Sequence, residues 1–195
     1  MATTLATWTI EPVHASIEFS LDYRGLSTYR TGFRALEGSL EVDAAWPAAS
    51  SVNASIPVAS VDVTNDRLMS RLIDPDLVGG KGHPTINFKC TRVEAVEPTQ
   101  WKLTGDLTIP GVTRPVVLDT RYFGQAKHPF SGKIAAPFRA ETAIDRRDFG
   151  VTWNAAMDTG GAYLGERMQI SPAIMAIRQD SDESGAGRER RAAHP

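Results

Sequence analysis

The chain contains one stretch whose pattern specifies a β-hairpin, Gly105-Asp106-Leu107-Thr108-Ile109-Pro110-Gly111-Val112-Thr113-Arg114-Pro115-Val116-Val117-Leu118. Apolar residues alternate with polar ones up to Ile109, and the alternation resumes at Val112. A period of two is typical of a strand with one buried face. Proline followed by glycine supplies the fixed φ and the tolerance of positive φ that a type II turn requires. The stretch therefore predicts two antiparallel strands joined at Pro110-Gly111.

The same alternation recurs on both sides of the hairpin. Strands are expected at residues 8–10, 17–24, 29–42, 52–58, 86–90, 101–109, 112–122, 136–144 and 166–178. Gly32 and Gly38 fall inside a strand pattern, where glycine usually marks a bend or a bulge. In the last strand we expect the register to slip near Ser171-Pro172.

One segment departs from this pattern. Between residues 64 and 73 apolar residues recur at helical spacing, and Thr64 or Asn65 can cap the first turn. The segment predicts one helical insertion, which ends at Asp74-Pro75.

Roughly eight long antiparallel strands with no βαβ rhythm favour an all-β barrel or sandwich. Residues 179–195 carry no apolar face and are expected to be a disordered tail.

Composition narrows the classes of partner. The formal net charge is -2, so a nucleic-acid partner is not expected. The first residues have no basic segment followed by an apolar one, and no run approaches the ~20 apolar residues of a membrane span. We therefore expect a cytoplasmic protein without a stable membrane anchor. The single cysteine, Cys90, lies on the apolar side of its strand and is interpreted as a small buried hydrophobe.

Sequence motifs for catalysis or cofactor binding are not found. Of the four histidines, at positions 14, 83, 128 and 194, no two are close enough in sequence to suggest a pair of metal ligands. The chain has no HExxH, GxSxG, P-loop or GxGxxG pattern. The sequence thus predicts no metal site, no cofactor and no enzyme active site.

Taken in order, several segments resemble the YceI-like family of lipocalin-fold proteins. The most specific pieces are the hairpin at 105–118 and the corner Arg146-Arg147-Asp148-Phe149-Gly150. Further matching pieces are residues 8–14, 17–19, 32–33, 36–38, 60–88 in outline, and 164–170. Together they cover the chain from residue 8 to about residue 178, so residues 1–178 are expected to form a single YceI-like barrel.

The resemblance implies an eight-stranded antiparallel β-barrel with a long hydrophobic tunnel that holds an isoprenoid-type or similar amphiphilic lipid, often in a homodimer. It also implies a carrier or sequestering protein without chemistry of its own. The chain departs from the family pattern at Tyr23, at Leu68, Met69 and Arg71 in the insertion, and at Gly79. These departures suggest that the lipid head group, or even the ligand class, differs.

Large apolar residues at the inward-facing positions of the strands are the candidates for the tunnel wall. Burial of an isoprenoid chain against them contributes about 0.8 kcal/mol of binding free energy per methylene. The candidate ligand-binding residues are Phe19, Leu21, Tyr23, Phe33, Ile56, Phe88, Trp101, Leu118, Tyr122 and Phe138. The same residues equally fit a barrel whose interior is filled by its own side chains.

Two other functions stay open from the residues. The barrel is alternatively an enzyme, for instance a cyclase of an isoprenoid intermediate with Tyr23, His14 or Glu18 as acid–base groups. A third possibility is an interaction or stress-response protein whose barrel is filled and dry.

Arg146 and Asp148 are expected to fix the corner before Phe149 by a local ion pair or cap.

Overall fold

The computed structural model of the protein describes residues 5–43, 46–63, 85–109, 111–154, 160 and 162–179. Its strands are β1 (Ala6–Ile10), β2 (Ser16–Tyr23), β3 (Ser27–Phe33), β4 (Glu37–Val42), β5 (Ser51–Pro57), β6 (Thr85–Glu97), β7 (Gln100–Ile109), β8 (Val112–Tyr122), β9 (Ala126–Lys127), β10 (Ile134–Asp145) and β11 (Leu164–Arg178). Four 3-10 helices accompany them: η1 (Pro12–His14), η2 (Pro47–Ala49), η3 (Val58–Ser60) and η4 (Arg146–Phe149).

The helix expected at 64–73 lies outside the described residues, as do the departures at Leu68, Met69, Arg71 and Gly79 and the tail from residue 180 onward. Among the residues that are described, no helix is long and apolar enough to span a bilayer.

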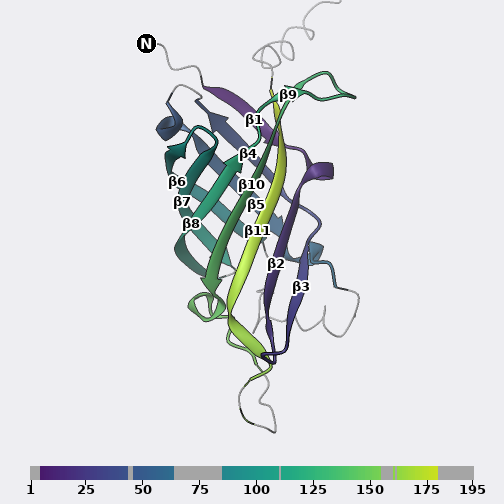
Figure 1. Ribbon diagram of the computed structural model, residues 1–195, viewed down its shortest axis with the longest axis vertical. Helices are drawn as coiled ribbons and strands as arrows, with labels where there is room; N and C mark the ends of the chain where they lie inside the picture. The colour runs from purple at the N-terminus through teal and green to yellow at the C-terminus, as the bar shows by residue number, and fades with distance from the viewer. Residues whose placement is uncertain are drawn as a thin grey trace, which may run out of the picture.

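Eight strands close into a barrel (Figure 1). Their order is β11-β1-β4-β5-β6-β7-β8-β10, and β10 pairs with β11 to complete the ring. Every pairing in the ring is antiparallel. The sequence prediction of an eight-stranded antiparallel barrel is confirmed, and the sandwich alternative is wrong because the sheet closes on itself.

Two of the barrel's strands are interrupted, and together with the two-residue strand β9, which pairs with β10, this accounts for the strand segments beyond the eight of the ring. β1 and β2 lie end to end along β11, with Ile10 opposite Ala176 and Ser16 opposite Ala173. Pro12, which lacks an N–H, opens the 3-10 turn between them. The strand expected at 29–42 is likewise broken into β3 and β4 between Phe33 and Glu37.

The hairpin forms as its pattern predicts. Ile109 lies opposite Val112, and Gly111 adopts φ +89°, a conformation in which a glycine avoids the strain of a side chain. Gly105 is required for a different reason, the lack of room for a side chain. A Cβ at this position would lie 2.5 Å from Cζ of Phe88 on the neighbouring strand. The ring of Phe88 therefore packs directly over the backbone of β7.

The last strand differs from the expectation in one respect. The register between β10 and β11 is the same on both sides of Pro172, with Arg139 opposite Ala173 and Thr142 opposite Ile170. The irregularity lies instead in the pairing of β11 with β2, between Leu164 and Met168. Proline interrupts the ladder because it has no N–H to donate, but it does not displace the strand.

Candidate binding cavity

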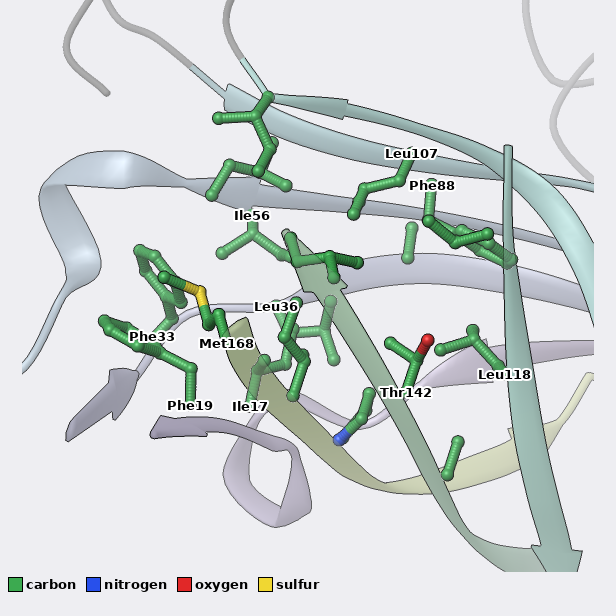
Figure 2. A pocket seen from close by; sticks show the side chains of 18 of the residues that line it. Ile17, Phe19, Phe33, Leu36, Ile56, Phe88, Leu107, Leu118, Thr142 and Met168 are labelled. Atoms are coloured by element: carbon green, nitrogen blue, oxygen red, sulfur yellow. The ribbon is translucent and has the colours of Figure 1, made fainter. Parts of the chain in front are cut away.

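The barrel encloses a cavity of about 870 Å³. Strands on all sides contribute inward-facing apolar side chains, and in Figure 2 Ile17, Leu36 and Ile56 point toward one another across it. Phe88, Leu107 and Leu118 form another part of the wall (Figure 2). Polar side chains in the wall are few, and several of them gather at the end where β2 stops and β11 begins. The wall is thus an apolar sleeve with one more polar end.

Nine of the ten predicted residues line this cavity: Phe19, Leu21, Tyr23, Phe33, Ile56, Phe88, Trp101, Leu118 and Phe138. Tyr122 does not. Its ring stacks on Phe138 at 5.3 Å and on Trp101 at 5.6 Å between centroids, and because Tyr122 lies opposite Phe138 in the ladder it packs beside these two wall residues on the same inner face. This aromatic cluster of Trp101, Tyr122 and Phe138 lies where β7 begins and β8 ends, at the opposite end of the barrel from Tyr23.

Sequence reasoning missed many of the aliphatic wall residues. Ile17, Leu107 and Ile109 share the parity of predicted residues on their strands, so the period-two pattern already pointed to them. Met168 and Ile170 on β11 carried a weaker signal, because the expected register slip made the inward parity of that strand ambiguous. The list of candidate wall residues favoured large aromatic side chains. The alternation of inward-facing and outward-facing positions along each strand was the better predictor of the wall.

The more polar end is built around Arg146. This side chain is 3% exposed and lines the cavity. Its Nε donates to the carbonyl of Gly165 at 2.9 Å, and its Nη1 donates to the carbonyls of Val151 at 2.6 Å and Trp153 at 2.9 Å. Burial lowers the pKa of the guanidinium, but an arginine side chain keeps its charge in proteins. Arg146 thus fixes the chain after η4 and leaves a positive charge in the wall.

The expected partnership of Arg146 with Asp148 is wrong. The cap of η4 is Asp145, whose Oδ1 accepts from the backbone N–H of Arg147 at 2.9 Å, and the Arg147 side chain pairs with the same carboxylate at 2.7 Å. These hydrogen bonds lower the pKa of Asp145 from 3.8 to about 2. Asp145 is preferred because its carboxylate, at the N-cap position, faces the free N–H groups of the first turn.

Tyrosine hydroxyls complete this end. Tyr23 is 38% exposed although it lines the cavity, so it stands at the rim. Its ring is 6.0 Å from that of Tyr163, which also lines the cavity, and the guanidinium of Arg24 lies 5.2 Å from the Tyr163 ring. The rim therefore offers hydroxyl donors and a cation close to the apolar wall. We call Tyr23, Tyr163 and Arg146 the polar rim.

The acid–base groups considered for an enzyme do not converge. Tyr23 faces the cavity, whereas His14 and Glu18 are not among the residues that line it. His14 is instead bonded to Glu11, with 2.6 Å between Nδ1 and Oε2. Cys90 is half-buried, and burial raises the pKa of its thiol, which agrees with its interpretation as an unreactive apolar residue.

The size of the cavity limits what it can contain. An empty apolar cavity of this size would be costly, because the cost of a cavity rises with its volume. Buried water needs about three polar partners each, and the middle of this wall offers few. An apolar molecule is the occupant that the wall suits best, and the filled-barrel alternative finds no support.

Comparison with known proteins agrees with this geometry. The family model described as YceI-like domain matches residues 8–176. A curated relative from Azotobacter vinelandii, named UPF0312 protein, is 34% identical over 141 residues, which span 72% of this chain and 73% of the relative.

Two solved structures show the same fold. A YceI protein from Campylobacter jejuni matches with a TM-score of 0.66 and 25% identity, over 80% of this chain and 88% of its own. A polyisoprenoid-binding domain from Saccharophagus degradans matches with a TM-score of 0.58, over 90% of this chain and all of its own, and at 11% identity shares the fold alone.

Proposed function

The chain belongs to the YceI-like family, and from that premise we propose that it binds a single amphiphilic lipid with a long apolar chain, of the isoprenoid type, inside its barrel. The observation that carries the proposal is the apolar cavity of about 870 Å³. Its volume lies within the range of roughly 300–1,000 Å³ of small-molecule pockets. The Saccharophagus domain of the same fold, described as polyisoprenoid-binding, supports this class of ligand.

The distribution of polar groups supports one orientation for the ligand. The apolar chain extends toward the aromatic cluster of Trp101, Tyr122 and Phe138, which offers no charge. The head group lies at the polar rim, where Tyr23 and Tyr163 carry hydroxyls and Arg146 carries a positive charge. Buried phenols and guanidinium groups normally require hydrogen-bond partners, and an oxygen-bearing head group provides acceptors for them.

A carrying or sequestering role fits this wall better than catalysis does. General acid–base chemistry needs groups that converge on one substrate atom, and of Tyr23, His14 and Glu18 only Tyr23 reaches the cavity. A cyclase would also need an acid to start the reaction, and burial raises the pKa of Tyr29 in the wall, which makes this phenol a weaker acid.

The direct test is native mass spectrometry of freshly purified protein, followed by organic extraction and identification of the released compound. We expect a near-stoichiometric amphiphile with a long apolar chain. If the protein carries none, it is mixed with vesicles that contain geranylgeraniol and measured again. Protein that remains free of ligand after both steps would overturn the proposal.

Two further expectations belong to the proposal. A cytoplasmic location is tested by fractionation of the cells that express the chain, and its appearance in an extracytoplasmic fraction would contradict it. A homodimer is tested by size-exclusion chromatography with light scattering, where the mass of a single chain at micromolar concentration would contradict it. Neither result affects the ligand class.

A further inference from the structure

We propose that Glu11, His14 and His128 form a binding site for a divalent transition-metal ion such as Zn²⁺. The three residues provide one carboxylate oxygen and two imidazole nitrogens, and these atoms all lie within 4.8 Å of one another. None of the three residues lines the cavity of the barrel, so the site is separate from the lipid.

Tertiary structure brings these residues together from distant parts of the chain. Glu11 directly follows β1, His14 ends η1, and His128 follows β9, whose end of the barrel β1 shares (Figure 1). β11 connects them, because Ala176 on that strand lies between Ile10 of β1 and Ala136 of β10. β9 in turn pairs with β10.

Both ends of the site are held by the backbone. The N–H of Glu11 donates to the carbonyl of Met175 at 2.8 Å, which fixes the chain where β1 ends. The N–H of His128 donates to the carbonyl of Lys133 at 2.7 Å, and the N–H of Gly132 donates to the carbonyl of His128 at 2.9 Å. These two bonds close a tight loop, so the ligands on both sides are positioned by the sheet rather than by free segments.

The distances fit a metal after small side-chain adjustments. The Oε2 atom of Glu11 is 2.6 Å from Nδ1 of His14 and 3.9 Å from Nε2 of His128. A tetrahedral ion with bonds of about 2.0–2.1 Å separates its ligand atoms by about 3.3 Å. One observed separation is shorter than this value and the other longer, so the side chains must adjust to bring the three ligand atoms to a common distance.

The donor set determines the class of metal. Imidazole and carboxylate together suit zinc and its neighbours, whereas calcium and magnesium prefer oxygen ligands alone. The side chains of His14 and Glu11 are 47% and 24% exposed, and that of His128 is 9% exposed. Three protein ligands with one open side leave the fourth position of a tetrahedral ion to water.

His128 also has the outer partner that metal-bound histidines usually have. Oγ of Ser131 lies 3.2 Å from Nδ1 of His128 and accepts a hydrogen bond from Nδ1–H when Nε2 faces the ion. The backbone N–H of Ser131 lies 3.3 Å from the same nitrogen and donates to it in the other tautomer, which carries the proton on Nε2. Metal binding therefore selects the tautomer with the proton on Nδ1.

The test uses the full chain without an affinity tag, freed of metal by EDTA and titrated with Co²⁺ and Zn²⁺. We expect one equivalent of Co²⁺ with the visible absorption bands of a four-coordinate ion, which Zn²⁺ displaces. His14→Gln and Glu11→Gln should each weaken binding at least about tenfold. His83→Gln and His194→Gln serve as controls, because they remove the other two histidines and should leave binding unchanged.

His128→Gln should have the same effect, but its burial makes it the variant most prone to misfold. His14→Gln, at an exposed position, carries the test in that case. The proposal is overturned if the wild-type chain binds no ion, or if His14→Gln and Glu11→Gln bind Co²⁺ as tightly as wild type does. Loss of binding in a control variant instead would place the site elsewhere and would equally overturn it.

Discussion

Ala140→Trp should shorten the tunnel at the end that receives the lipid chain. Ala140 lines the cavity on β10, in the same row across the sheet as Thr120 and Trp101. An indole at this position projects into the space in front of the aromatic cluster. The matched control is Arg139→Trp, because Arg139 is the preceding residue on β10 and is exposed.

The size of the effect follows from the burial it prevents. If the indole keeps about three carbons of the chain out of the cavity, the loss is about 2.4 kcal/mol at about 0.8 kcal/mol per methylene. This loss weakens Kd about 50-fold. The free energy of unfolding should stay within about 1 kcal/mol of wild type, because the indole enters open space and not a packed core, where overfilling costs about 1–3 kcal/mol.

Displacement of the fluorescent probe N-phenyl-1-naphthylamine by geranylgeraniol and by the shorter geraniol measures this effect. We expect Ala140→Trp to weaken binding of the longer alcohol much more than that of the shorter one, while Arg139→Trp changes neither. Equal binding of geranylgeraniol to wild type and Ala140→Trp would show that the chain does not reach this end. A comparable loss in the Arg139 variant would refute the reasoning that the inner face binds the lipid.

Three further predictions concern the frame of the cavity. Gly105→Ala should cost about 1–3 kcal/mol, measured by urea unfolding, because the new methyl would lie 2.5 Å from the ring of Phe88; an unchanged midpoint would contradict this close packing. Asp145→Asn should lower stability above pH 3.8, and its difference from wild type should shrink as the pH falls from 3.8 to about 2, because a depressed pKa stabilises the fold only while the carboxylate is ionised. Thermal unfolding across that range checks this, and a difference independent of pH would argue against the pairing with Arg147. Arg146→Ala should cost at least about 3 kcal/mol, because three carbonyl groups lose their donor. Arg146→Lys should recover only part of the lost unfolding free energy in the same denaturation assay, since lysine lacks the planar guanidinium that donates several hydrogen bonds at once. Full recovery would show that the charge alone matters.

Local pattern was sufficient to predict most strands of this barrel. Strand side chains alternate between two faces, so a run such as 17–23 shows its buried side in the order of its residues. The turn at Gly111 was equally visible, because few residues other than glycine adopt φ +89° without strain. Where the pattern did mislead, at Pro172, the strand kept its register because neighbours on both sides held it.

Residue type alone assigned the partner of Arg146 wrongly. The charge on Arg146 suggested an ion pair with Asp148, but the side chain is buried among carbonyl groups of the segment that follows η4. The partners of Arg146 depend on how the chain folds back after β10 ends, which the residue type does not reveal. Tyr122 does lie on the inner face, opposite Phe138, and its ring packs against Trp101 and Phe138.

The amino-acid order by itself therefore determined the strands, their inward faces and the hairpin, because these depend on neighbours along the chain. Only the closed barrel decided that the inward faces leave a cavity, since the diameter of the ring depends on the number of strands and on how β10 meets β11. The same closure placed His128 beside His14, with 5.9 Å between ring centroids, although 113 residues separate them in the chain. Contacts of that kind depend on the pairing of distant strands, which no local period in the sequence records.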